Sequence, residues 1–374
     1  LPQEIAKRTL GADQFPLWAG PKGWQTSAHN PTVLDAILTG NPHPVRAMYV
    51  SGVNIAVTYP DTNKVMAALK SLDFLVVASH MMTPTSEIAD IVLPKTTGLE
   101  EEEVSLEPSA QIVCYTNPVI APRGEARSDF DFTTDLARRL EARGINTRKF
   151  FPWETKQEFN EYLLGDEIDW KILRKNGWAP FDFKLGNFEE AGFKTPSGKI
   201  ELWSETLDGL GIDPLPNYVS PRAESADPTT RQEYPFVLIT GAREKTYHHS
   251  RYRDQAWARK VSPFPLLQVN PETATASGLA EGDWVAVETP GVDGRCKLKV
   301  SITEETGPGT VRTGMGWWLP EAPGPERGAL DVNVNVALSY DGPWDPVTGS
   351  ADTRGLPCRL TLVPDAEIPM RESA

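Results

Sequence analysis

The chain has 374 residues, enough for two or three domains at the usual size of about 150 residues each. It holds 40% hydrophobic and 24% charged residues, the balance of an ordinary globular protein. Its net charge is -14, so the chain lacks the excess of Lys and Arg that would neutralise the phosphates of a nucleic acid. Nucleic acid is therefore excluded as a partner. No apolar run approaches the roughly 18 residues of a membrane span.

Three cysteines, Cys114, Cys296 and Cys358, stand far apart and show no metal-binding spacing, so we expect buried free thiols. The chain begins Leu-Pro-Gln-Glu-Ile, without an initiator Met or a signal peptide. We therefore expect these residues to be part of a longer polypeptide, and the compartment stays open between cytoplasm and periplasm.

The first region, residues 1–149, is predicted to be α/β. Apolar runs at 47–50, 74–78 and 91–93 have the character of buried strands, and Asp61 is placed to cap a helix between the first two. Strand, helix, strand at this spacing favours a doubly wound sheet, whose ligand loops lie at the carboxyl ends of its strands. Gly52 and Asn54 follow the first strand, as a plain turn or as a binding loop.

Two later features of this region are predicted to be structural. The acidic run 100–103 is typical of a solvated face, because adjacent carboxylates do not converge on one cation. Residues 129–143 form an amphipathic helix ended by Gly144, with Phe132, Leu136, Ala137 and Leu140 at helical spacing.

Residues 150–233 are predicted to be an irregular, Trp-rich connection. Short helices are expected at 154–164 and 168–175, and the stretch 213–227, rich in Pro, Ser and acidic residues, indicates a linker. The tryptophans either anchor loops to a core or line an aromatic pocket.

The third region, 234–374, opens with a short apolar strand at 236–239 that Thr240 and Gly241 are expected to stop. A dense basic and polar run follows, which indicates either a grip for an anionic ligand such as pyrophosphate or a solvated loop. Its members are Arg243, Lys245, His248, His249, Ser250, Arg251 and Arg253.

The rest of this region is predicted to be β-rich. Strands are expected at 266–270, 284–288, 296–302 and 311–318, and Asn270 caps a helix that starts at Pro271 and ends at Gly278. Many short strands with tight turns favour a compact barrel.

Several segments in this order resemble one family. Residues 239–243 (Ile-Thr-Gly-Ala-Arg), 247–253, 268–274, 278–285 and the Gly-Trp-Trp of 316–318 resemble the dinucleotide-binding domain of molybdopterin oxidoreductases of the dimethyl sulfoxide reductase type. Upstream, 83–94 is similar to that family's Ala-Asp-x-Val-Leu-Pro segment, followed by 122–127. Near the end, 333–335 and 344–349 (Trp-Asp-Pro-Val-Thr-Gly) resemble its closing motifs.

The resemblance implies a bis(molybdopterin guanine dinucleotide) cofactor with Mo or W, and a final domain that is a six-stranded double-psi barrel. The residues it assigns to cofactor binding are Gly52, Asn54, Thr240, Gly241, Arg243, His248, His249, Ser250, Asn333 and Asn335. It also implies a small-molecule substrate, an iron–sulfur electron-transfer subunit, and a 4Fe-4S cluster in polypeptide outside these residues.

The family's protein ligand to the metal lies in an N-terminal half that these residues do not match, so we assign no catalytic and no metal-ligating residue and expect the 374 residues alone to be inactive. Three functions are compatible. The first is molybdenum-dependent two-electron or oxygen-atom-transfer chemistry, and the second is a tungsten-dependent hydratase or transhydroxylase. The third is a cofactor-free assembly module. The Gly-Trp-Trp segment and the His-Ser-x-x-Arg spacing are more similar to the acetylene-hydratase-like and anaerobic-dehydrogenase branch than to formate dehydrogenases.

Overall fold

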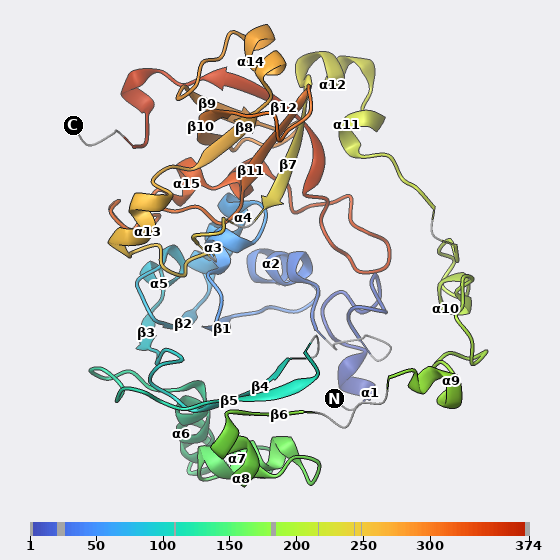
Figure 1. Cartoon of the computed structure of the whole chain (residues 1–374), viewed down its shortest axis with the longest axis vertical. Coiled ribbons are helices and arrows are strands. Elements are labelled where there is room, and N and C mark those ends of the chain that lie inside the picture. The colour runs from blue at the N-terminus through green and yellow to red at the C-terminus, as the bar shows by residue number, and fades with distance from the viewer. Residues whose placement is uncertain are drawn as a thin grey trace. The chain divides into compact units, whose positions relative to one another are not determined.

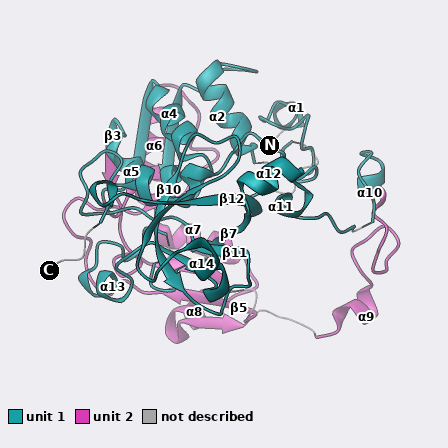
Figure 2. Ribbon diagram, turned by 90° about the horizontal axis from the view of Figure 1, so that it is seen from above, with its two compact units in different colours: residues 1–77, 82–91, 206–374 teal, residues 78–81, 92–205 magenta. Residues whose placement is uncertain are grey.

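A computed structural model describes residues 3–20, 27–107, 110–180, 185–215, 217–242, 244–247 and 249–370. Contacts between residues group the chain into two compact units, which Figure 2 colours separately. Unit 1 comprises residues 1–77, 82–91 and 206–374, and unit 2 comprises residues 78–81 and 92–205. Each unit has its own buried cores, so each is described by itself.

The α/β region at the start of the chain is organised around a short sheet. Its strands β1 (Ala47–Ser51), β2 (Phe74–Ser79) and β3 (Ile91–Pro94) neighbour one another in that order, which confirms the three predicted strands. Helix α4 (Thr62–Ser71) begins as expected, because the Asp61 side chain accepts a hydrogen bond from the Lys64 backbone N–H at 3.0 Å. The core of this part is formed by Leu34, Val50, Ile55, Val65, Ala68, Leu69, Leu75, Val77 and Tyr340.

The remaining helices of the first ninety residues are short. Only α2 and α4 reach ten residues, and they contact one another. The others pack locally through small or capped ends. Their bounds are α1 (Gln3–Ala6), α2 (Asn30–Thr39), α3 (Ile55–Thr58) and α5 (Pro84–Glu87).

Six strands of unit 1 close into a barrel with the order β10-β8-β11-β7-β12-β9 (Figure 1). Two pairs, β10 with β8 and β11 with β7, are parallel, and the other four are antiparallel. Alternate side chains fill the interior, as on β10, where Cys296, Leu298 and Val300 are buried. The strands are β7 (Phe236–Ala242), β8 (Leu266–Val269), β9 (Trp284–Glu288), β10 (Cys296–Ile302), β11 (Thr310–Gly314) and β12 (Arg354–Leu362).

The barrel confirms the predicted six-stranded architecture and corrects two strand ends. Strand β7 continues through Thr240 and Gly241, because a register shift against β11, between the pairs Ile239–Arg312 and Ala242–Gly314, absorbs the glycine, whose φ is +83°. Strand β11 ends at Gly314, four residues earlier than predicted. Trp317 and Trp318 therefore leave the barrel wall and are buried outside it.

The helices around the barrel include the one predicted from capping residues. Helix α14 (Pro271–Ser277) is capped by Asn270, which accepts from the Glu272 N–H at 2.9 Å, and it ends at Gly278. The others in this part are α10 (Glu205–Asp208), α11 (Arg222–Ser225), α12 (Pro228–Glu233), α13 (Ala256–Val261), α15 (Ala329–Val332), η1 (Val334–Ala337) and η2 (Asp365–Glu367).

All three cysteines are free thiols, as predicted. Cys296 and Cys358 are buried in the barrel core, whereas Cys114 is half-buried in unit 2. Burial raises the pKa of Cys358 to about 12, so this thiol stays protonated and unreactive at neutral pH.

Unit 2 contains a three-stranded antiparallel sheet of order β4-β5-β6 with four helices. Val113, Tyr115, Leu164, Leu173 and Ala179 form its core. Both helices expected in the Trp-rich stretch are present. The elements are β4 (Glu103–Glu107), β5 (Ile112–Thr116), β6 (Trp178–Pro180), α6 (Asp129–Glu141), α7 (Lys156–Leu164), α8 (Trp170–Asn176) and α9 (Asn187–Ala191).

One member of the acidic run 100–103 departs from the solvated face that the sequence suggested, while Glu103 is exposed as expected. Glu100 is only 8% exposed, and its carboxylate accepts hydrogen bonds from the Thr97 N–H at 2.7 Å and the Arg123 N–H at 2.9 Å. The bond from the Thr97 backbone is the main reason that the pKa of Glu100 is lowered. Glu100 therefore fastens a turn to a distant loop, a role that charge patterning alone does not reveal.

Helix α6 forms where predicted but buries a different face. Its buried side chains are Phe130, Thr134 and Ala137, while Leu136 is 57% exposed. The helix starts with a reciprocal capping box between Ser128 and Asp131. Because Phe130 packs on Phe151 and Phe159, the aromatic residues of the following stretch determine which face is covered.

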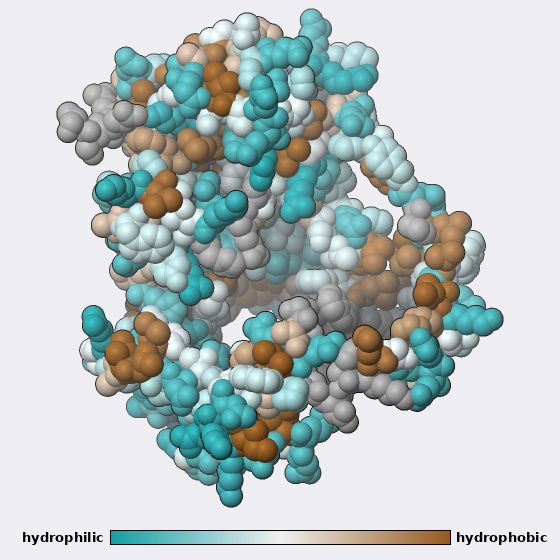
Figure 3. Space-filling view, viewed as in Figure 1, coloured by the Kyte–Doolittle hydropathy of each residue, from teal (hydrophilic) through white to brown (hydrophobic). Residues whose placement is uncertain are grey.

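Exposed apolar side chains gather along α9 and the segment that follows it in unit 2, in the brown surface at the right of Figure 3. They are Leu185, Phe188, Phe193, Ile200, Leu202 and Trp203. Phe188 and Phe193 stack on each other, and none of the six belongs to the unit's core.

No helix among the described residues is long and apolar enough to cross a membrane.

His29 links the start of α2 to the Asp-Pro-Val-Thr-Gly segment near the chain's end. Its imidazole is 2% exposed, with Nε2 2.8 Å from the Gly349 carbonyl and Nδ1 2.8 Å from the Thr32 hydroxyl. Phe15 and Trp344 pack against the ring. Burial lowers the pKa of His29, and the smaller effects of the Gly349 carbonyl and Asp35 act in the opposite direction.

We expect acid to destabilise unit 1 through His29. Because its folded pKa lies below the unfolded value of about 6.5, the unfolded state binds a proton first. Stability is full above pH 6.5 and falls as the pH drops through that value. His29→Gln removes this titration and keeps a donor for Gly349, so its melting temperature should fall less between pH 7.5 and 5.5 than that of the wild type. The exposed His43→Gln serves as control, and equal slopes for all three proteins would disprove the assignment.

Candidate dinucleotide site

All ten predicted cofactor-binding residues belong to unit 1. Arg243 and His248 lie outside the residues that the structure describes. The other eight fall into three groups: Gly52 and Asn54 with Ser250 and His249, Thr240 and Gly241 at the end of β7, and Asn333 with Asn335 at η1.

Asn54 and Ser250, 196 positions apart in the sequence, are joined by a hydrogen bond. Asn54 is the N-cap residue of α3 and is 6% exposed. Its Nδ2 donates to Ser250 Oγ at 2.9 Å. The loop after β1 and the basic run after β7 therefore meet at one point, although the sequence predicts them as separate binding loops.

Thr85 fixes the orientation of the Asn54 amide. The Thr85 Oγ1 accepts from the Ala56 N–H at 3.0 Å, so its own hydrogen is available for Asn54 Oδ1, 2.6 Å away. The Thr85 backbone N–H also points at that oxygen, at 3.4 Å. Because both groups donate to Oδ1, the amide nitrogen must face Ser250.

Trp318 completes this arrangement. Its indole Nε1, which is a donor only, lies 3.2 Å from Ser250 Oγ, and the side chain is 1% exposed. Ser250 Oγ therefore accepts twice, from Asn54 and from Trp318, and its hydroxyl hydrogen is left to donate. Among the described residues no acceptor for that hydrogen is present, so the half-buried Ser250 hydroxyl keeps one donor unused.

The second group lies at the end of β7. Thr240 is 4% exposed and donates through Oγ1 to the Thr353 carbonyl at 2.5 Å, which ties the strand end to the start of β12. Gly241 is half-buried with φ of +83°, and a Cβ there would lie 3.2 Å from Arg354 Nη2. A side chain at this position would press on the guanidinium, so the glycine allows Arg354 to pack closely against the end of β7.

Arg253 departs most from the predicted basic patch. Its side chain is 0% exposed and lies between the rings of Tyr247 and Trp317, each 4.3 Å from the guanidinium carbon. Nε donates to the His249 carbonyl at 3.1 Å and Nη2 to the Gly316 carbonyl at 3.2 Å. Arg253 therefore stabilises the loop through its bonds to the His249 and Gly316 carbonyls, and is not a solvated or ligand-facing cation.

Burial lowers the pKa of Arg253 to about 9, which still leaves the guanidinium charged at neutral pH. Its Nη1 is a buried donor without an acceptor among the described residues. His249, held by this arginine, has a φ of +59°, and a Cβ on Gly316 would lie 2.9 Å from its Nδ1. The loop therefore has an energetically unfavourable backbone conformation at His249, which the hydrogen bond from Arg253 stabilises.

The third group faces the chain itself. Asn333 and Asn335 are 0% and 2% exposed, and their Nδ2 atoms donate to the same acceptor, the Val57 carbonyl, at 3.0 and 2.9 Å. They hold α3 in place, and α3 carries Asn54 at its start. Gly52, by contrast, is exposed with φ of +74° and no atom within 4 Å of a Cβ position, so the loop after β1 is open there.

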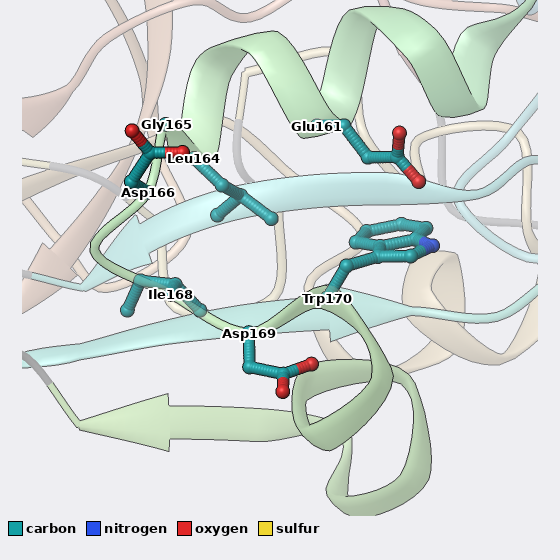
Figure 4. Close-up of a pocket in the computed structure, with 7 residues that line it drawn as sticks. All are labelled: Glu161, Leu164, Gly165, Asp166, Ile168, Asp169 and Trp170. Atoms are coloured by element: carbon teal, nitrogen blue, oxygen red, sulfur yellow. The ribbon is translucent and has the colours of Figure 1, made fainter.

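The pocket of unit 2 does not have the right chemistry for an anionic ligand. The pocket of unit 2 shown in Figure 4, about 340 Å³, is lined by Glu161, Asp166 and Asp169 around Trp170. Glu161 accepts from Gln157, and Asp169 caps α8. Among the described residues no cluster of three or more His, Cys, Asp and Glu is placed to hold a metal ion.

The donor set of unit 1 fits a dinucleotide anion. It offers the outward Ser250 hydroxyl, the guanidinium of Arg354 beside the side-chain-free Gly241, and the open turn at Gly52. The guanidinium is a charge-assisted donor, the hydroxyl is a neutral donor, and the open turn allows the backbone to come close to a ligand. Phosphates and a purine are bound by groups of these kinds.

Two family models match in order along the chain. Residues 27–139 match "Molybdopterin oxidoreductase", and residues 236–357 match "Molydopterin dinucleotide binding domain". The chain belongs to the molybdopterin oxidoreductases of the dimethyl sulfoxide reductase type. The second match covers five of the six barrel strands fully and contains Thr240, Ser250 and Arg354, which confirms the predicted family and its molybdopterin dinucleotide cofactor.

Individual relatives agree with this family. Acetylene hydratase from Syntrophotalea acetylenica is 32% identical over 95% of this chain and 52% of its own length. Dimethyl sulfoxide reductase DmsA from Escherichia coli is 28% identical over 73% of the chain and 36% of its own length. The solved structure of acetylene hydratase from Pelobacter acetylenicus superposes with a TM-score of 0.86 at 30% identity, over 96% of this chain and 52% of that one. The chain thus spans about half the length of these relatives or less.

Four residues that shape the site were not selected from the sequence as ligand-positioning residues: Thr85, Trp318, Arg253 and Arg354. Thr85 and Trp318 lie in segments noted for the family resemblance, but nothing in those segments shows which polar atoms they orient. Arg253 was read as one of several exposed cations. Arg354 follows the Asp-Pro-Val-Thr-Gly segment as a lone arginine, and only the pairing of β12 with β7 brings it to Gly241.

Replacing Arg253 should destabilise unit 1 strongly. Arg253→Lys keeps the charge but loses the fork that reaches two carbonyls, at an expected cost of about 3 kcal/mol. Urea unfolding followed by tryptophan fluorescence measures this, since Trp317 lies on the guanidinium. The exposed neighbour Arg251→Lys is the matched control and should change stability by less than about 0.5 kcal/mol. Equal stability of the two variants would contradict the proposed stabilising role of Arg253.

Proposed function

We propose that this chain supplies the dinucleotide-binding surface of a molybdenum-dependent enzyme that carries out two-electron or oxygen-atom-transfer chemistry on a small molecule. The observation that carries the proposal is the ordered match of both family domains to a chain that superposes over 96% of its length on a solved member. Reductases among its relatives, such as dimethyl sulfoxide reductase and trimethylamine-N-oxide reductase, support redox chemistry.

The chain's own residues bind and orient the cofactor in this proposal. Arg354 and Gly241 would hold a phosphate, Ser250 would donate to a ligand oxygen, and Gly52 would let the chain approach closely. Thr85, Trp318 and Arg253 keep these groups in place before the ligand arrives, which lowers the entropy cost of binding. When bound, the metal–pterin group supplies the electron or oxygen-atom chemistry.

A second candidate is a tungsten-dependent hydratase without net redox change. The acetylene hydratase relative, 32% identical over 95% of the chain, favours it specifically. The Gly-Trp-Trp segment that brings Trp318 to Ser250 belongs to the same resemblance. Metal identity separates the two candidates.

The electron path belongs to the first candidate. An iron–sulfur subunit and a 4Fe-4S cluster in polypeptide outside these residues would carry electrons to or from the metal, as expected of an enzyme of anaerobic metabolism. The hydratase candidate requires no such external partner for turnover.

The test of the proposed function is the cofactor content of the full-length protein, purified natively and without oxygen. We expect molybdenum by elemental mass spectrometry, together with two pterins per chain by fluorescence after oxidation. Tungsten in place of molybdenum would favour the hydratase. Absence of both metals and of pterin would overturn both candidates and leave an assembly module.

Removing the oriented hydroxyl should loosen the cofactor. In the full-length protein, Ser250→Ala eliminates a donor to an anionic group, and we expect about tenfold faster loss of pterin during dialysis. Ser301→Ala, a half-buried serine on strand β10, is the control and should retain pterin like the wild type. Unchanged retention in Ser250→Ala would remove Ser250 from the site.

A further inference from the structure

Arg327 lies in the loop 319–328 and reaches the short helix α5. Its Nε donates to the Glu87 carboxylate at 2.7 Å, and its Nη2 donates to the same oxygen. Glu87 is the last residue of α5, and each of the two side chains is 21% exposed. A charge-assisted bond between partly buried groups is screened less than an ion pair on the surface. The loop and α5, 240 positions apart in the sequence, are therefore joined at this point.

Arg327 also holds the two residues that follow Trp318. Its Nη1 donates to the Pro320 carbonyl at 2.7 Å. Its backbone carbonyl accepts a hydrogen bond from the Leu319 N–H at 2.8 Å. The Trp318 indole in turn donates to the Ser250 hydroxyl. Arg327 therefore supports the segment that carries one of the two donors to Ser250.

Glu87 connects Arg327 to the other donor, Asn54. Thr85 precedes Glu87 in α5, is fully buried and bonds to the Asn54 amide oxygen at 2.6 Å. A helix of four residues has little stability of its own, so tertiary bonds such as that of Glu87 must hold α5 in place. Displacing α5 would release the Asn54 amide, whose nitrogen donates to Ser250 at 2.9 Å.

The backbone of the loop 319–328 is shaped around this contact. Arg327 has a φ of +45°, a value that residues other than glycine rarely adopt. A Cβ on Gly324 would lie 2.9 Å from Glu87 Oε2, so a side chain there would press on the carboxylate that Arg327 binds. An unfavourable backbone conformation persists only where surrounding contacts impose it. The bonds of Arg327 to Glu87 and Pro320 are contacts of this kind.

We propose that Arg327 is a positioning residue that couples the two donors to the Ser250 hydroxyl, Asn54 and Trp318. Because one guanidinium supports the segments that carry both donors, the two hydrogen bonds to Ser250 are kept or lost together. The inference rests on the proposed function, in which Ser250 donates to a ligand oxygen. It adds the residue that keeps this hydroxyl in a fixed direction without touching the ligand.

A neighbouring ion pair provides a matched control. Lys70 bonds to Glu326 at 2.9 Å and so joins the same loop to helix α4. The two side chains are 47% and 32% exposed, so this pair contributes little to stability. In the part of the chain that the structure describes, neither side chain bonds to α5 or to residues 318–320.

The first test measures loss of pterin during dialysis of the full-length protein. Arg327→Met removes the guanidinium and should make the loss at least about fivefold faster. Arg327→Lys should give an intermediate rate, because an ammonium does not reproduce the planar fork that reaches a carboxylate and a carbonyl together. Lys70→Met should retain pterin like the wild type.

The variant that combines Arg327→Met with Ser250→Ala distinguishes positioning from general stabilisation. If Arg327 acts through Ser250, the combined variant loses pterin no faster than Ser250→Ala alone. If Arg327 only stabilises the fold, the two effects multiply.

Hydrogen exchange of the same proteins, followed by mass spectrometry, tests the coupling without reference to the cofactor. In Arg327→Met, backbone amides in both 83–88 and 317–321 should exchange faster than in the wild type, because each segment loses a bond to the guanidinium. Lys70→Met should change neither segment. Faster exchange in only one of the two segments would overturn the coupling.

The outcomes separate this inference from the proposed function. Retention of pterin by Arg327→Met at the wild-type rate, or multiplied effects in the combined variant, would overturn the positioning role and leave the proposed function standing. Wild-type retention by Ser250→Ala would overturn the inference together with the role of Ser250. A wild type without pterin would overturn both the inference and the proposed function. Circular dichroism shows whether each variant is folded, and Arg327→Lys with Ser250→Ala decides the matter if Arg327→Met does not fold.

Discussion

The Val57 carbonyl oxygen is the acceptor on which the arrangement of the site depends. Two buried amides, from Asn333 and Asn335, donate to it and hold the short helix α3 in place. At the start of α3, Asn54 turns its amide nitrogen to Ser250. A four-residue helix has little stability of its own, so these tertiary bonds are what give the Asn54 amide a defined direction. Hydrogen bonds of the Asn333, Asn335 and Asn54 amides therefore connect η1 through α3 to Ser250.

Arginines in the same part of the chain serve opposite purposes. Arg253 is fully buried between Tyr247 and Trp317, and two carbonyls accept hydrogen bonds from its Nε and Nη2. Arg354 is exposed and has no bonded partner among the described residues. The first stabilises a loop whose backbone at His249 has a positive φ of +59°, whereas the second packs against Gly241 with its side chain exposed. Charge counts do not distinguish them, because the distinction is one of burial and of partners.

The elements that were predicted well have strong local signals. Asn270, Pro271 and Gly278 set both ends of α14, and the alternation of Cys296, Leu298 and Val300 sets the inner face of β10. Predictions failed where contacts distant in sequence decide. Glu100 was assigned to solvent but is bonded to Thr97 and Arg123, and the expected break at Gly241 is a bulge within β7. A register shift depends on the neighbouring strands, which no local pattern contains.

The sequence by itself determined the family and the order of the α/β and barrel parts, because motifs, turn residues, caps and periodicity are local properties of the chain. Only the tertiary structure decided which polar atoms meet. Asn54 and Ser250 are 196 positions apart, and Gly241 and Arg354 are separated by more than a hundred residues. Their pairing follows from closing the barrel and docking α3 against η1. The direction of a hydroxyl hydrogen or a guanidinium edge is set there, by geometry that spacing along the chain does not encode.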